Sequence, residues 1–148
     1  MKKFQRNSVT VTFCACIVLA NFAPSASAAV FNNLTVGADY ATGSNWDVAV
    51  VPVTPSGPVV IGFPGFTPVS PIYSTATSYT ADGILYVGGS PWGVGNGTLT
   101  LGGSAGTLSY GHLYIGASAG STGAVTVNAG TFTVGGGDIV LGTAGSGA

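Results

Sequence analysis

The side chains that could carry acid–base chemistry are few. Beyond residue 6 the chain has one histidine and four aspartates and has no Lys, Arg or Glu. These groups are His112, Asp39, Asp47, Asp82 and Asp138. A metal shell or a nucleophile with its base needs more partners than one histidine and one carboxylate. We therefore predict no catalytic residue, no metal ligand and no cofactor, and we expect His112 and Asp138 to form a solvated polar corner.

Three aromatic side chains are the candidate ligand-binding residues. Tyr86 and Tyr114 follow Leu85 and Leu113 in two matching segments. Alternate residues of a strand point to opposite faces, so inward leucines place both tyrosines outward. The two tyrosines are predicted to form an exposed aromatic ladder suited to stacking on sugar rings, and Trp92 is the third candidate for carbohydrate binding. The other reading is that these rings cover the protein's own loops.

The charge of the chain excludes several classes of protein. Of its 148 residues only 5% are charged, the formal net charge is -1, and all three basic residues lie in the first six positions. Nucleic-acid binding requires Lys or Arg against the phosphates, so it is excluded. Electrostatic binding to anionic lipid is excluded for the same reason. The composition indicates a structural protein, not an enzyme.

Residues 1–28 have the layout of a secretory signal peptide. The basic start is followed by the mostly apolar stretch 9–22 and by small residues at Ser25–Ala28, which predict cleavage after Ala28. Both cysteines, Cys14 and Cys16, lie in this segment, so the mature chain has neither thiol nor disulfide. We expect export without a transmembrane segment in the mature chain, to the cell surface, the outer membrane or the medium.

Residues 29–82 are aromatic, rich in proline and irregular. Proline cannot donate to a sheet ladder, so only short strands are expected between the prolines. The predicted strands are Phe31–Val36, Val48–Val51, Pro58–Ile61 and Tyr73–Tyr79. The aromatic residues predicted to cover an apolar end of a larger structure are Phe31, Trp46, Phe63 and Phe66. This segment is interpreted as the N-terminal cap of a solenoid.

Residues 83–148 contain a repeat of about 26 residues whose last copy is incomplete. Leu85, Leu113 and Ile139 occupy matching positions, and Gly97 matches Gly123. Each unit contains three short strands separated by glycine-rich turns. A fixed period between 20 and 50 residues is typical of solenoids and propellers. A propeller blade needs four strands, so three strands per unit favour a solenoid.

The strands alternate apolar residues with Thr, Ser or Gly, which predicts one buried and one wet face. The side chains expected inside are those of Leu99, Leu108, Leu113 and Val125. Those expected outside are Thr98, Thr100 and Thr107. The predicted fold is all-β, a right-handed parallel β-helix (solenoid) with an irregular Pro-rich N-terminal capping segment. The right hand follows from the general preference of parallel crossovers.

The repeat reads Leu-Tyr-Val-Gly-Gly at 85–89, Gly-Asn-Gly-Thr-Leu-Thr-Leu at 95–101 and Gly-Thr-Leu at 106–108. It resembles the β-strand repeats of bacterial autotransporter passengers, especially the repeat shared by type V secreted and PEP-CTERM-sorted surface proteins. Asn45-Trp46 and Val59-Val60-Ile61-Gly62 are similar to the segment that often precedes such repeats. The resemblance implies an exported, adhesin-like or matrix β-solenoid without known catalysis. The chain departs from that pattern because it shows neither a translocator barrel nor a sorting helix, which leaves its secretion route open.

We therefore predict a secreted or cell-surface structural solenoid, with a surface glycan or a host or matrix protein as its partner. The alternatives are a carbohydrate-binding module, an ice-binding solenoid built on stacked Thr and Ser side chains, and a fragment of a polysaccharide-active enzyme. The third repeat begins at Asp138 and reaches Gly142 before the sequence stops at Ala148. We expect adjoining solenoid turns from a longer chain to cover this end, because each turn buries its apolar side chains only against its neighbours.

Overall fold

The chain folds into three parallel β-sheets. The computed structural model describes residues 28–52, 57–63, 68–142 and 146–147. The first sheet has the order β1 (Ala29–Phe31), β2 (Val59–Ile61), β5 (Ile84–Val87), β8 (His112–Ile115) and β11 (Ile139–Leu141). The second has the order β3 (Ile72–Tyr73), β6 (Asn96–Leu101), β9 (Thr122–Val127) and β12 (Ser146–Gly147). The third has the order β4 (Tyr79–Thr80), β7 (Thr107–Tyr110) and β10 (Thr131–Val134).

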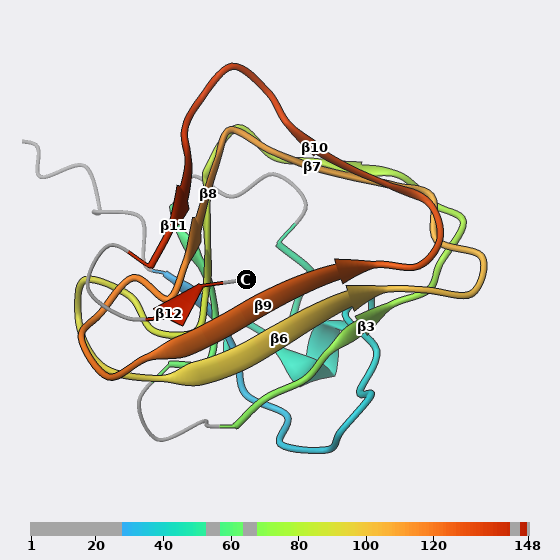
Figure 1. The fold of residues 1–148 in the computed structure, drawn as a ribbon. Coiled ribbons are helices and arrows are strands. Elements are labelled where there is room, and N and C mark those ends of the chain that lie inside the picture. The colour runs from blue at the N-terminus through green and yellow to red at the C-terminus, as the bar shows by residue number, and fades with distance from the viewer. Residues whose placement is uncertain (1–27, 53–56, 64–67, 143–145, 148) are drawn as a thin grey trace, which may run out of the picture.

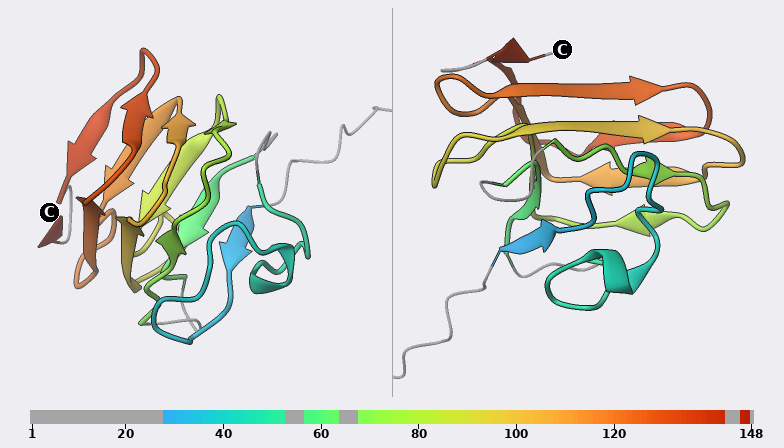
Figure 2. Two further views of the ribbon diagram at one scale, coloured as in Figure 1. Left: turned by 90° about the vertical axis from the view of Figure 1, so that its right-hand side faces the viewer. Right: turned by 90° about the horizontal axis from the view of Figure 1, so that it is seen from below.

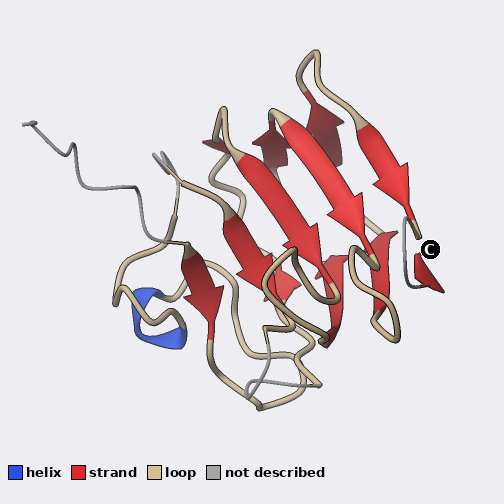
Figure 3. Ribbon diagram, turned by 90° about the vertical axis from the view of Figure 1, so that its left-hand side faces the viewer, coloured by secondary structure: helices blue, strands red, loops and turns tan. Residues whose placement is uncertain are grey.

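These sheets are the sides of a right-handed coil, as predicted, and the coil has about four turns (Figure 1). In Figure 1 the chain runs along β8, β9, β10 and β11 in the counterclockwise direction, and later turns lie nearer the viewer. A path that turns counterclockwise as it approaches the viewer is right-handed, in agreement with the preference of parallel crossovers. Strands dominate the described chain, and its helix is the single 3-10 turn η1 (Gly43–Asn45) (Figure 3).

The strand register confirms the repeat spacing seen in the sequence. Leu85 pairs with Leu113, and Leu113 pairs with Ile139. Gly97 pairs with Gly123 in the second sheet. A slip by one residue would turn every inward side chain outward, so this agreement fixes both faces of the sheets.

The sequence predicted that the repeats start at Gly83, but the coil begins earlier in the chain. Strands β2, β3 and β4 form a complete turn within the Pro-rich segment and pair with β5, β6 and β7. The backbone carbonyls of Val69, Pro71 and Tyr73 accept hydrogen bonds from Thr98, Thr100 and Gly102. Proline lacks only the N–H group, so its carbonyl still joins the ladder. Predicted strands at Phe31–Val36 and Val48–Val51 are wrong: β1 ends at Phe31, and 48–51 forms turns and irregular backbone.

The core consists of the inward side chains of the stacked turns. Leu85, Leu99, Leu108 and Leu113 are buried in one apolar cluster, as the alternation predicts. Val125 is half-buried against that cluster. Thr98 is exposed as predicted, while Thr100 and Thr107 are half-buried. The facing of the strands is therefore confirmed.

Glycines bring the first and second sheets close together at one corner of the coil. An added Cβ at Gly123 would lie 2.1 Å from the carbonyl oxygen of Val87, and at Gly97 it would lie 2.7 Å from that of Ile61. Real Cβ atoms do not approach backbone oxygens this closely. Because Gly97 and Gly123 are paired neighbours, the same close corner recurs in successive turns.

The N-terminal end of the coil is closed by residues that precede β2. Phe31, Tyr40 and Trp46 are buried there, and Trp46 Nε1 donates a 2.9 Å hydrogen bond to the Tyr40 carbonyl. Figure 2 shows this segment with η1 at the end of the stack opposite the C-terminal turn. The hydroxyls of Tyr40 and Tyr110 hydrogen-bond to each other in the core. Burial is the main cause that raises the pKa of both phenols.

The C-terminal turn leaves its inward side chains open to solvent in the described structure. Ile139 and Leu141 of β11 are 62% and 58% exposed. Their paired equivalents one turn earlier, Leu113 and Ile115, are 4% and 3% exposed. The difference arises because β11 covers β8 while no described strand of the first sheet lies beyond β11.

No helix in the described ranges is long and apolar enough to cross a membrane. The predicted signal peptide lies outside the described residues except for Ala28, and Phe66 also lies outside them. Phe63 packs on the outer face of the first sheet and does not cover the N-terminal end.

Candidate functional site

His112 and Asp138 are neighbours on successive turns, as the register predicts. The backbone N–H of Asp138 donates a 3.1 Å hydrogen bond to His112 Nδ1, and Asp138 Oδ2 lies 3.9 Å from the same nitrogen. A carboxylate that orients a catalytic histidine accepts a hydrogen bond from the Nδ1–H group. Here Nδ1 accepts a hydrogen bond from the Asp138 backbone N–H, so the pair lacks that arrangement. Both side chains are well exposed, which matches the predicted solvated corner.

Two other aspartates hold the irregular N-terminal segment together. Asp47 Oδ1 accepts a 2.8 Å hydrogen bond from the Val30 backbone, and Asp39 accepts hydrogen bonds from Ala41 and Thr42. The contact of Asp39 with the Ala41 backbone is typical of a turn, whereas the contact of Asp47 joins β1 to a segment 17 positions later. Within the described chain no group of three or more His, Cys, Asp or Glu could hold a metal ion.

The aromatic candidates Tyr86, Tyr114 and Trp92 form one cluster on the outer face of the first sheet. Tyr86 pairs with Tyr114 in register, and their ring centroids lie 5.3 Å apart. The Trp92 ring meets Tyr86 in a T-shaped contact with centroids 5.9 Å apart. Stacking of the two tyrosines on successive turns is therefore confirmed.

The exposure predicted for this ladder is wrong for Tyr86, which is only 7% exposed. Tyr86 packs with Val30 and Val60 of the same outward column, and the Trp92 ring lies beside it. Burial, and then the nearby Tyr114 hydroxyl, raise the pKa of the Tyr86 phenol. Tyr114 is half-buried, whereas Trp92 is 56% exposed. Trp92 is thus the accessible ring of the three.

Trp92 lies at the tip of a tight turn. The backbone N–H groups of Ser90 and Gly93 donate to each other's carbonyls, each over 3.1 Å, so Pro91 and Trp92 form the centre of the turn. Proline favours the first central position of a turn because its φ is already fixed. The backbone N–H of Trp92 also donates a 3.3 Å hydrogen bond to Ser90 Oγ.

Thr and Ser side chains form columns on the other outer faces. In the third sheet Thr80, Ser109 and Thr133 are in register over three turns. In the second sheet Thr98 is paired with Ala124, which interrupts a hydroxyl column. The columns are the feature on which the ice-binding alternative depends.

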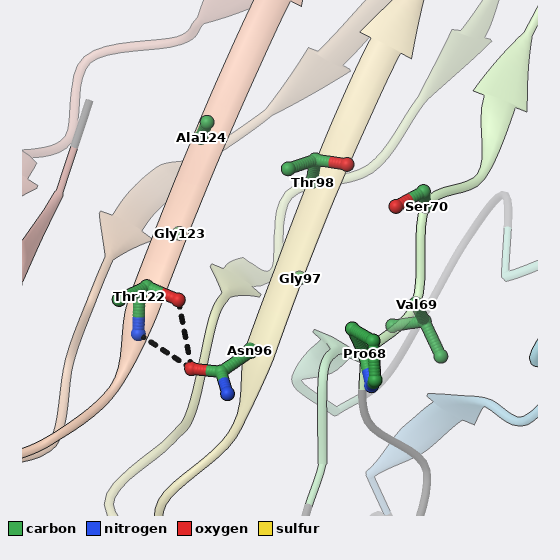
Figure 4. A pocket seen from close by; sticks show the side chains of 9 residues that line it. All are labelled: Pro68, Val69, Ser70, Asn96, Gly97, Thr98, Thr122, Gly123 and Ala124. Carbon is green, nitrogen blue, oxygen red and sulfur yellow. Dashed lines mark hydrogen bonds between the residues drawn. The ribbon is translucent and has the colours of Figure 1, made fainter. Parts of the chain in front are cut away.

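A shallow groove of about 220 Å³ crosses the second sheet (Figure 4). Its lining residues are Pro68, Val69, Ser70, Asn96, Gly97, Thr98, Thr122, Gly123 and Ala124. Within it the side-chain oxygen of Asn96 accepts hydrogen bonds from the backbone N–H and the hydroxyl of Thr122. The groove was not predictable from the sequence because its lining residues come from three turns of the coil. The polar contacts inside it join one turn to the next.

The fold and these surfaces place the chain among parallel β-solenoids. Comparison with protein-family models, with curated proteins and with solved structures finds no match to the chain.

Proposed function

We propose that the chain is an exported structural β-solenoid, adhesin-like and without catalysis, displayed at the cell surface or released. The observation that carries this proposal is the chemistry of the outer faces. Three parallel sheets present columns of Thr and Ser hydroxyls and of aromatic and aliphatic side chains over successive turns. Regular uncharged columns suit many weak contacts along an extended partner, and they do not concentrate the acids and bases that a reaction needs.

Two features of the sequence support export. The first 28 residues have the layout of a secretory signal peptide. The repeat at 85–108 resembles that of autotransporter passengers, so we propose a surface protein related to them. Its partner would be a surface glycan or a host or matrix protein.

Cell fractionation of a bacterium that expresses the full chain tests this proposal. We expect the chain in the exported fraction, with its N-terminus at Ala29 or within about two residues of it. N-terminal sequencing and protease accessibility on intact cells provide the readout. A chain that retains Met1 and stays inside the cell would contradict the proposal.

An adhesive surface needs at least one place that binds. Among the described surfaces, the turn that carries Trp92 has the most specific construction, because it combines an exposed indole with buried polar supports.

A further inference from the structure

The turn that carries Trp92 is an insertion in the repeat. Residues 88–95 connect β5 to β6, whereas the shorter segment 116–121 connects β8 to β9 one turn later. Gly88 and Gly116 follow paired residues, and Asn96 pairs with Thr122, so both connections start and end at matching places. The connection in the second turn of the coil therefore has two extra residues, and the tip of this connection consists of Pro91 and Trp92.

Buried hydroxyls hold the inserted turn in place. Ser90 and Ser121 are almost completely buried at its base. Ser121 Oγ accepts a 3.1 Å hydrogen bond from the Gly95 N–H, and the Ser118 hydroxyl donates to the Ser90 carbonyl. Residues of the third turn of the coil thus fix the position of the longer connection, residues 88–95, in the second turn of the coil. Gly89 makes this possible, since its φ is +76° and an added Cβ would lie 2.1 Å from Ser121 Oγ.

A rigid turn that exposes a tryptophan has the properties of a binding site. Trp92 is 56% exposed, and its neighbours Pro91 and Val94 are exposed as well. An indole whose turn is held by hydrogen bonds to the neighbouring turn and whose ring is open to solvent suits stacking on an apolar ligand face. Behind it lie the buried ring of Tyr86, in T-shaped contact with Trp92, and the half-buried ring of Tyr114.

The charges of the chain select the ligand. All Lys and Arg residues lie in positions 1–6, and four aspartates follow. Acidic polysaccharides require cations for their carboxylates or sulfates, which this surface lacks. A neutral pyranose instead offers an apolar C–H face that packs on an indole.

We propose that the Ser90–Gly93 turn is a binding site for a neutral glycan, with one pyranose ring stacked on Trp92. The proposal deepens the adhesin-like function and rests on it for its biological setting.

Titration of the purified full chain with soluble neutral oligosaccharides tests the site. Cello-, xylo- and chito-oligosaccharides are the probes, and oligogalacturonate is the acidic comparison. Calorimetry gives the affinity, and acrylamide quenching follows the two tryptophans, of which Trp46 is 2% exposed. We expect at least one neutral probe to bind and to protect Trp92 from quenching, and the acidic probe to bind at least about tenfold more weakly.

Three variants separate the site from the fold. We expect Trp92→Ala to weaken binding by about tenfold or more and Trp92→Phe to retain part of it. Replacing residues 88–95 by the sequence of 116–121 should abolish binding and preserve the circular dichroism spectrum, because the third turn already uses that connection. Val36→Ala, at an 84% exposed position in the N-terminal segment, is the matched control and should bind like the unchanged chain.

The proposal is overturned if no neutral probe binds, if Trp92→Ala binds as well as the unchanged chain, or if the acidic probe binds equally. Binding of an apolar peptide at Trp92 in place of every sugar would also overturn it, since the turn would then dock a protein. These binding measurements use purified protein. A negative result would therefore overturn the glycan site alone, and the proposed export is tested separately by fractionation.

Discussion

Two leucines in neighbouring turns of the same sheet provide a direct test of how the coil is stabilised. Leu113 lies between Leu85 and Ile139 in the inward column and is 4% exposed. Leu141 points inward from the last described strand of that sheet and is 58% exposed. The substitution Leu→Ala removes the same atoms at both sites. A difference between the two losses in free energy of unfolding therefore measures the contribution of the turn that covers Leu113.

The expected costs differ by a factor of about three. Leu113→Ala removes a buried side chain and leaves a cavity between two turns, which costs about 2–5 kcal/mol. Leu141 has less than half of its surface buried. Full burial of a leucine contributes about 1.5–3 kcal/mol, so Leu141→Ala should cost about 1 kcal/mol.

Equilibrium unfolding of the full chain in urea measures both costs, and equal m-values would show that the variants unfold from comparable states. Thr98→Ala, at an exposed position of β6, is the control and should change the free energy of unfolding by less than about 0.5 kcal/mol. Equal losses for Leu113→Ala and Leu141→Ala would refute the reasoning, because they would require the C-terminal turn to be covered. A loss at Thr98 as large as at Leu113 would refute the facing of the strands.

Further predictions concern the close corner and the buried phenols. Gly123→Ala should cost about 1–3 kcal/mol in urea unfolding, because its Cβ would lie 2.1 Å from the Val87 carbonyl. Gly102→Ala, whose nearest contact would be 3.9 Å, should be nearly neutral. Burial raises the pKa of Tyr40 and Tyr110 above the ordinary 10.0. Stability should therefore be unaffected by these groups below pH 10 and fall above it, where the unfolded phenols ionise first; an equally steep fall in the variant that carries both Tyr40→Phe and Tyr110→Phe would contradict this.

The repeats after Gly83 were predictable because their signals are local. Alternation of Leu and Thr over four to six residues defines the inward face, and glycine marks each corner. The spacing of Leu85, Leu113 and Ile139 then gives the register without knowledge of the long-range contacts. Each strand pairs with the equivalent strand one period away, so one periodicity determines all three sheets.

The predicted strands Pro58–Ile61 and Tyr73–Tyr79 overlap β2 and the adjoining ends of β3 and β4, but their place in a first turn of the coil was missed because these strands are too short to show alternation. Strand β3 has two residues, and Pro68 and Pro71 lie just before it. Its pairing depends on carbonyl groups that every residue has, so composition carries no trace of it. The predicted strand at Val48–Val51 has suitable side chains, but Ala49 has a positive φ of 56° and the chain turns there.

At the candidate site the sequence predicted the stacking of Tyr86 on Tyr114 and missed the burial of Tyr86. Burial depends on Trp92 and on the Val30–Val60 column, and these contacts come from a loop and from the Pro-rich segment. One signal could have indicated the loop. The spacing from Leu85 to Gly97 exceeds that from Leu113 to Gly123 by two residues, and the longer connection contains Pro91 and Trp92.

The insertion also shows why a coil of this kind can acquire a binding site at a corner. Residues added between β5 and β6 leave the pairs Leu85–Leu113 and Leu99–Val125 in register, because each turn contacts only its neighbours through the sheets. A corner loop can therefore lengthen without disturbing the core, whereas an insertion inside a strand would reverse its faces. The added residues gain a fixed position only if a neighbouring turn holds them. Ser118 and Ser121 do this for the turn that carries Trp92, so that turn has hydrogen-bonded support because the coil continues past it.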